Sequence, residues 1–376
     1  MPVHHPASLY ETLSAGGFSV PFNLKVDPME RLLLVEFAKD PDPLYQTFEI
    51  QVFDDLEHGK GMLVLAEQRD KKIDVYHQPG LDLTKTDYSI VGKGLDEMLE
   101  RSMEGARYEV SHYGVDVQVA FDDKLGRAVR IRICEKGLKP CNPFNMLAPM
   151  GSGTENPPSL PLVILYDFYF VRRAGTEVEV LIDGVSHRPD GLIFPIDGRR
   201  VHFIRYSADP FILNWNEKQD GPLEPLCVEK PGEHRHGETV YNLVDNQGRM
   251  ELSGMRPAQS RRDIRFVFDP PFPDLACLRE GAQGEGEFTL WMEDIGTLEG
   301  VYSFQRLGGQ ARVEVHPSRG WRPRVGHASA RMIFSLARNF KDWPKTYRWN
   351  AVLDLEDGEQ PRIKSGWSRT RVFRRK

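Results

Sequence analysis

Several polar side chains in the middle of the chain have the types and spacing to hold or transform a small molecule. Asp167 and Asp209 could act as proton donors, a role that requires a buried carboxyl group. Asn214 and Asn216 could form hydrogen bonds with hydroxyl groups of a ligand on one side of a strand, with Trp215 as a stacking surface. Three further candidate ligand contacts lie on the same segment: His187, Arg205 and Tyr206. The segment therefore predicts a site for a small organic ligand.

A purely structural role of this segment is an open alternative to ligand binding. Phe211, Leu213 and Trp215 alternate onto one side of the expected strand, and Asn214 and Asn216 alternate onto the other. A strand with a solvated polar edge and a core tryptophan would show the same pattern. The sequence alone does not tell which side is buried.

A metal site or a phosphate site is not expected. His234 and His236 share one side of an extended segment, but glycines flank them and no third histidine follows at a suitable spacing. We interpret this segment as a mobile polar loop. The Gly151–Asn156 stretch has the glycines of an anion-binding turn and lacks the lysine of a phosphate-binding loop. The sequence thus predicts no metal and no cofactor.

The elements that position these residues are mainly strands. Val115, Val117, Val119 and Phe121 alternate with polar residues, and Val129, Ile131 and Ile133 repeat the pattern after a turn, which predicts a hairpin. Two more strand pairs are expected: 48–53 with 62–66, and 177–182 with 201–206. Helical spacing of apolar residues occurs at 94–105 and at 329–343, where we expect short helices.

The expected fold class is all-β and mainly antiparallel, with two β-barrel or β-sandwich modules and two or three short helices. Strands that alternate with helices, as a parallel α/β sheet requires, are missing. Prolines and glycines cluster at 140–161, which we interpret as a linker. The predicted modules are therefore residues 1–139 and residues 162–376, the second ending in a basic segment.

Composition and charge exclude several classes of protein. The chain has 376 residues, 40% hydrophobic residues and 28% charged residues, which argues against a disordered chain. Its four cysteines are scattered, and its longest apolar run is broken by a charge, so we expect a cytoplasmic protein without a membrane span. Residues 319–376 carry eleven Arg and four Lys against five acids, a net charge of +10 within a chain of net charge −6. We expect solvated surface charge there and no nucleic acid partner.

The plan of two antiparallel β-modules with few helices resembles the tandem lipocalin-like barrel proteins, among which are carotenoid hydratases and related cyclising enzymes. This resemblance rests on size and strand content over the whole chain. It implies barrels with a ligand cavity. No diagnostic residue is matched, so it assigns no catalytic role.

Three functions follow as hypotheses. The first is the binding of a small lipid-like or other organic ligand in a β-barrel cavity, with a small organic molecule as partner. The second is an enzyme without metal or cofactor, a hydratase, cyclase or carbohydrate-active protein, that uses Asp167 or Asp209 as proton donor. The third is a scaffold whose basic C-terminal segment binds a partner or a polyanion.

Overall fold

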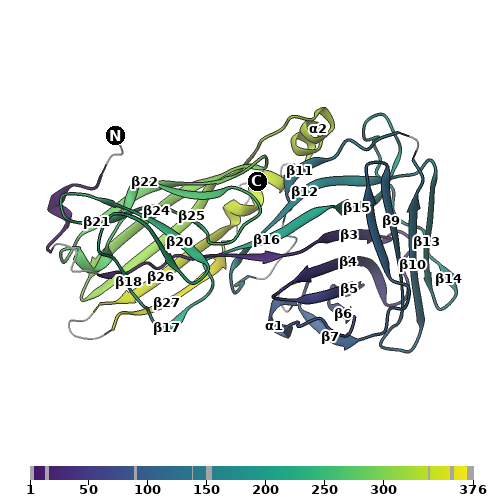
Figure 1. Cartoon of the computed structure of the whole chain (residues 1–376), viewed down its shortest axis with the longest axis horizontal. Coiled ribbons are helices and arrows are strands. Elements are labelled where there is room, and N and C mark those ends of the chain that lie inside the picture. Colours follow the sequence, from purple (N-terminus) through teal and green to yellow (C-terminus); the bar gives the residue numbers. More distant parts are fainter. Residues whose placement is uncertain are drawn as a thin grey trace, which may run out of the picture.

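The computed structural model describes residues 4–12, 17–88, 91–137, 139–149, 155–337, 339–355 and 360–370. Strands account for 57% of the structure and helices for 7%, which confirms the all-β fold class. Among the described residues, all strand pairs are antiparallel except one, in which β6 (Ile73–His77) runs parallel to β7 (Leu95–Glu100). Two β-units lie end to end along the long axis of the molecule (Figure 1).

The first β-unit is built on a long curved sheet with the strand order β2-β16-β12-β15-β3-β4-β5-β6-β7. The short strand β11 pairs with β12 beside this path. The remaining bounds are β2 Leu24–Pro28, β3 Arg31–Glu36, β4 Tyr45–Asp55, β5 Gly59–Gln68, β11 Phe144–Leu147, β12 Leu160–Arg172, β15 Val201–Ser207 and β16 Asp209–Trp215.

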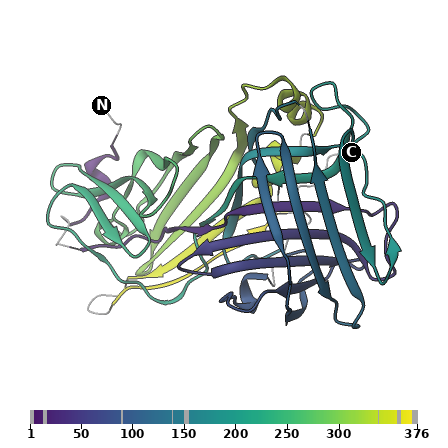
Figure 2. The same cartoon turned by 45° about the vertical axis from the view of Figure 1, so that its right-hand side comes forward.

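A five-stranded sheet covers the inner face of this curved sheet. Its order is β14-β13-β10-β9-β8, with bounds β8 Arg107–Ser111, β9 Gly114–Asp122, β10 Ala128–Glu135, β13 Thr176–Ile182 and β14 Val185–Ser186. Its strands run across those of the larger sheet (Figure 2), as in orthogonal sheet packing. The expected hairpin is confirmed as β9 and β10, because Val117 and Val119 pair with Ile133 and Ile131 and all four side chains are buried.

The second β-unit is one sheet with the order β17-β27-β26-β25-β24-β23-β22-β21-β20-β19. A small pair, β1 Gly17–Phe18 with β18 Leu226–Cys227, lies beside it. The bounds are β17 Asp220–Pro222, β19 Gly232–His236, β20 Thr239–Asp245, β21 Met250–Pro257, β22 Ile264–Pro273, β23 Gln283–Met292, β24 Gly296–Leu307, β25 Gln310–Pro323, β26 Tyr347–Asp354 and β27 Arg362–Arg369. Aromatic rings from several of these strands fill its inner face, among them Phe266, Phe268, Tyr302 and Trp349.

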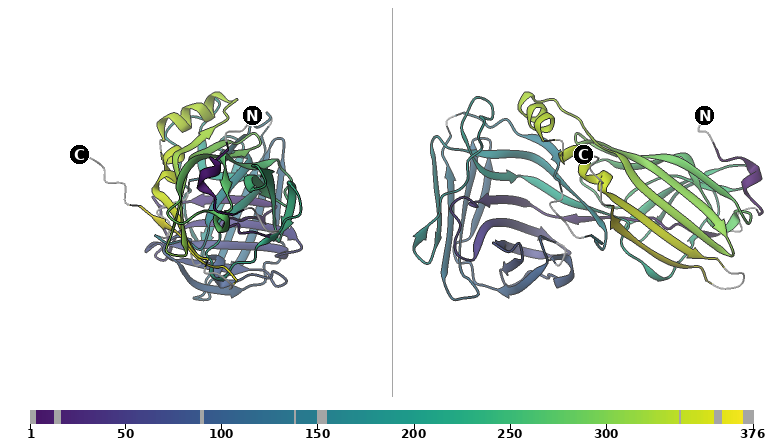
Figure 3. Two further views of the ribbon diagram at one scale, coloured as in Figure 1. Left: turned by 90° about the vertical axis from the view of Figure 1, so that its left-hand side faces the viewer. Right: turned by 180° about the vertical axis from the view of Figure 1, so that it is seen from behind.

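The helices are short. They are α1 Lys85–Tyr88, α2 Ala328–Leu336 and α3 Asn339–Asp342, with 3-10 turns η1 Ala7–Leu9, η2 Leu275–Cys277 and η3 Trp343–Thr346. Helix α2 confirms the first part of the helix expected at 329–343. It lies at the boundary of the two β-units (Figure 3), where Phe334 packs edge-on against Phe144 of β11.

Three local predictions were wrong. Residues 94–105 were expected as a helix, but 95–100 form β7, because hydrogen bonds to the edge of β6 override a weak helical stripe. Strands 177–182 and 201–206 both exist as β13 and β15 but belong to different sheets. The histidine segment 234–236 is part of strand β19 and not a loop, because it pairs with β20.

Strands β2 and β16 connect the two β-units. At their ends, the Leu24 backbone exchanges two hydrogen bonds with the Thr239 hydroxyl group of the second unit. The indole of Trp367 donates to the carbonyl oxygens of Trp215 and Asn216 at 2.8 and 3.1 Å. These bonds tie the last residues of β16 into the second unit.

The division into 1–139, 140–161 and 162–376 stays a prediction. Strands β2 and β3 share a sheet with β12, β15 and β16, so the curved sheet draws on both sides of 140–161. Residues 150–154 of the proposed linker and residues 371–376 of the basic segment lie outside the described residues. In the described part of the chain, no helix has the length and apolar character to cross a membrane.

Candidate functional site

The Asn214, Trp215 and Asn216 side chains lie where the two β-units join. Trp215 is fully buried, with ring centroids 4.9 to 5.2 Å from Phe266, Phe288 and Trp367. Asn216 is also fully buried, and its side-chain oxygen accepts from the Asn23 backbone at 3.0 Å. Asn214 Oδ1 accepts a 2.8 Å hydrogen bond from the Ser159 hydroxyl. These contacts anchor the end of β16.

Arg205 and Tyr206 are neighbours on β15 and so point to opposite faces of the sheet. The Arg205 guanidinium lies 4.1 Å from the centre of the Phe203 ring and pairs with Glu36 at 2.8 Å. The Tyr206 hydroxyl lies inside the unit, 3.5 Å from the Cys141 sulfur, and burial raises the pKa of both groups.

His187 is separate from these residues. Its Nδ1 lies 3.0 Å from the Asp40 carbonyl oxygen, and its ring packs against Phe37. The predicted ligand contacts therefore do not converge on one cavity wall, since alternation along β15 separates Arg205 from Tyr206 and His187 has partners of its own.

The two candidate proton donors differ in their surroundings. Asp167 is exposed at a bend of β12, where its φ of 50° marks a left-handed backbone conformation. Asp209 begins β16 and pairs with Arg262 at 2.5 Å. Neither carboxyl group is buried away from water and opposite charge in the way that a proton donor requires.

Asp209 nevertheless lines a cleft of about 720 Å³, which we call the junction cleft. The cleft lies between the β4–β5 turn of the first unit and the 235–261 region of the second, and β2 and β16 pass along it. Its apolar lining residues are Val26, Pro28, Met29, Leu56, Pro210, Phe211 and Ala258. Its polar lining residues are Asp54, Asp55, Glu57, Asp209, Arg235, Glu238, Gln259, Ser260 and Arg261.

Ion pairs occupy most of the charged groups around the junction cleft. Lys25 Nζ lies 2.5 Å from Glu57 of the first unit and 3.9 Å from Glu238 of the second. Arg261 of the second unit pairs with Glu30 of the first at 2.5 Å. The rim is thus largely neutralised by its own pairs, and the apolar surface of the cleft is what remains for a ligand.

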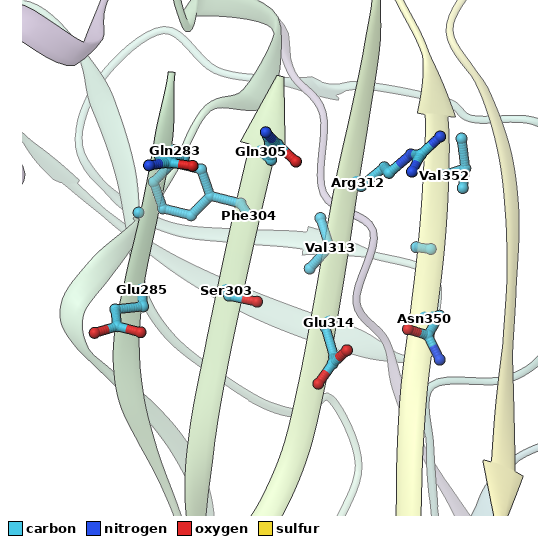
Figure 4. A pocket seen from close by; sticks show the side chains of 12 residues that line it. Gln283, Glu285, Ser303, Phe304, Gln305, Arg312, Val313, Glu314, Asn350 and Val352 are labelled. Carbon is cyan, nitrogen blue, oxygen red and sulfur yellow. The ribbon is translucent and has the colours of Figure 1, made fainter. Parts of the chain in front are cut away.

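A second hollow, which we call the sheet groove, lies on the second unit. It has a volume of about 630 Å³ and runs over strands β23 to β26 (Figure 4). The polar side chains along it are Gln283, Glu285, Ser303, Gln305, Arg312, Glu314 and Asn350. The two hollows differ in their amides, because the sheet groove has three, Gln283, Gln305 and Asn350, and the junction cleft has one, Gln259.

A buried polar cluster in the second unit joins Glu251 of β21 to Asn246 and to Tyr10 near the N-terminus. Glu251 is fully buried and accepts hydrogen bonds from the Tyr10 hydroxyl at 2.5 Å and the Asn246 amide at 2.8 Å. Asp274 is 1% exposed, and burial raises its pKa to about 6. Its carboxylate accepts from Ala276 N at 3.2 Å. Asp274 has the burial expected of a proton donor, but it lines neither cleft.

The raised pKa of Asp274 predicts a pH-dependent gain on its replacement. The carboxyl group of Asp274 has a pKa of about 6 in the folded protein and of 3.8 in the unfolded chain, so native stability falls as pH rises between these values. The free energy of unfolding of Asp274→Asn, taken relative to that of wild type, should therefore rise by about 2–3 kcal/mol between pH 4 and pH 7.5. Urea unfolding at both pH values measures this gain. Glu285→Gln, an exposed control, should show no such change, and a constant difference between wild type and Asp274→Asn would contradict the assignment.

The histidines of β19 have separate partners. His234 Nε2 lies 2.8 Å from the Lys230 carbonyl oxygen, and His236 Nε2 lies 4.0 Å from Glu224. Within the described ranges, no three His, Cys, Asp or Glu side chains are grouped closely enough to hold a metal ion.

Fold and clefts together define an all-β protein of two units with a ligand-sized hollow at their junction. Comparisons with protein-family models, with curated proteins and with solved structures gave no match. Of the residues that line the cleft, Asp209 was a sequence candidate as a proton donor, whereas Met29, Leu56, Phe211 and Arg261 were not among the candidate site residues. Leu56 follows Asp54-Asp55, and a leucine among polar turn residues is a sequence signal that could have pointed to it.

Proposed function

We propose that this protein binds a small organic molecule, mainly apolar with a polar end, in the junction cleft. The observation that carries the proposal is a hollow of about 720 Å³ between two β-units, with a group of apolar side chains among its lining residues. Volumes of about 300–1,000 Å³ are typical of small-molecule sites, and such sites often lie where two domains meet.

Most of the apolar contacts would come from the first unit, and Ala258 would add one from the second. Phe211 and Met29 are 7% and 4% exposed, so they form a fixed apolar floor held by the core. Leu56 is fully exposed at the tip of the β4–β5 turn and is free to close over a bound molecule. Burial of its side chain by a ligand would contribute about 1.5 kcal/mol or more to binding.

The polar end of the ligand would meet the rim. Ser260 and Gln259 are exposed lining residues that can donate and accept hydrogen bonds. Because Arg261, Lys25 and Asp209 already have ion-pair partners, a hydroxyl or amide end fits this rim better than a charged end. A lipocalin-like plan for the two units and a cytoplasmic location belong to the same proposal.

Titration with the neutral apolar dye N-phenyl-1-naphthylamine tests this function. Saturable fluorescence enhancement with one dye per protein is expected. Leu56→Ser should weaken binding about tenfold, since it removes one apolar wall. Ala258→Trp should abolish binding by filling the cleft.

Leu307→Ser is the matched control for the dye titration. Leu307 is 63% exposed and does not line the junction cleft, so this variant should bind the dye as wild type does. The proposed site would be refuted by an equal loss of dye affinity in Leu56→Ser and Leu307→Ser. Dye binding by Ala258→Trp as strong as that of wild type would refute it as well.

A further inference from the structure

Two straight rows of polar side chains cross the sheet groove. In one row Gln283 pairs with Gln305 across β23 and β24, and Gln305 pairs with Arg312 of β25. In Figure 4 these side chains lie in one line across the strands, with Val352 of β26 at its end. Neighbouring strands are about 4.8 Å apart, so the row offers a polar group at a repeat close to the length of one sugar ring.

The second row crosses the same strands, two residues away from the first row on each of them. Glu285 pairs with Ser303, Ser303 with Glu314, and Glu314 with Asn350. Ser303 is short and is flanked by the longer Glu285 and Glu314, which explains why the groove is hollow there (Figure 4).

The hydrogen-bonding groups of this groove are mostly unused. Gln283, Gln305 and Asn350 are exposed, and no side-chain hydrogen bond joins any of them to another described residue. Amides and a serine hydroxyl group both donate and accept, so together they match a ligand with many hydroxyl groups.

The charges of the groove cancel. Glu314 pairs with Arg348 at 2.5 Å, which leaves Glu285 and Arg312 as one negative and one positive group on the groove. A groove without net charge favours an uncharged ligand over an anion or a cation. Val301 and Val352, 40% and 36% exposed, add apolar surface on the same outer face.

We propose that the sheet groove binds a neutral oligosaccharide laid across strands β23 to β26. The amide rows bond its hydroxyl groups, and the valines contact the apolar faces of its rings. This site is separate from the junction cleft in position and in ligand chemistry. Failure of one of the two proposals would therefore leave the other unaffected.

Calorimetric titration of the full chain with four neutral hexasaccharides, of malto-, cello-, xylo- and chito- type, tests the proposal. Saturable binding of at least one of them is expected. The double variant Gln305→Ala/Asn350→Ala should weaken that binding about tenfold or more, because it removes two hydrogen-bonding amides. Both side chains are exposed and have no bonding partner in the described protein, so the fold should be retained.

Gln259→Ala is the matched control, because it removes an exposed amide from the junction cleft. It should leave oligosaccharide binding unchanged, and the double variant should leave dye binding unchanged. Absence of binding for all four hexasaccharides overturns the proposal. Binding that the double variant does not weaken overturns it as well.

Discussion

Replacement of Glu135 with alanine is expected to destabilise the protein by about 3–5 kcal/mol. Glu135 and Arg172 form an ion pair between β10 and β12, with side-chain exposures of 0% and 4%. Arg172 also donates to the Lys139 carbonyl oxygen at 2.6 Å and to that of Tyr113. Loss of the carboxylate leaves a buried guanidinium without its counter-charge. Urea unfolding at pH 7 measures the loss.

Two controls separate this effect from a general loss of ion pairs. Lys136 and Glu177 pair at 2.9 Å on the surface, and Lys136→Ala should give no measurable change. The double variant Glu135→Leu/Arg172→Met should recover most of the stability, since it removes both charges. If Glu135→Ala unfolds at the same urea concentration as wild type, the pair does not hold β10 to β12.

Replacement of Trp215 with alanine is expected to cost about 3–5 kcal/mol. The indole ends β16 of the first unit and fills a pocket of aromatic rings in the second, where Trp367 and Phe288 lie around it. Its removal leaves a large cavity and weakens the tie between the units. Thermal unfolding should occur at a clearly lower temperature.

Trp291→Ala is the control for this variant. Trp291 is half-buried and faces Arg265, whose guanidinium lies 5.9 Å from its ring centre. Its removal should destabilise the protein less than that of Trp215. An equal loss of stability in both variants would mean that Trp215 contributes no more to the stability of the protein than the half-buried Trp291.

Strands with one buried side could be predicted from sequence, and elements stabilised by distant partners could not. Val117, Val119 and Ile131 alternate with polar residues, so the β9–β10 hairpin was visible. Residues 95–100 carry a helical stripe but pair with β6, a contact that no local pattern contains. The ring contacts of Trp215 join segments more than fifty positions apart, so its burial could not be assigned in advance.

The candidate sites depend still more on distant contacts. The junction cleft collects residues from five segments, near 26, 55, 210, 236 and 260, none of which has a diagnostic spacing. The sequence marks Asp209 as one of two candidate proton donors but does not place Met29 or Arg261 beside it. The two rows of the sheet groove follow from strand register across β23 to β26, which alternation alone does not fix.

Photoaffinity labelling with an uncharged benzophenone probe tests the central claim, that the junction cleft holds an apolar ligand. After irradiation and digestion, mass spectrometry should find the label on Met29, Leu56 or Phe211. The label should be displaced by N-phenyl-1-naphthylamine and should be lost in Ala258→Trp. Labelling spread over exposed residues such as Leu307 and Leu336, and unchanged in Ala258→Trp, would contradict the claim.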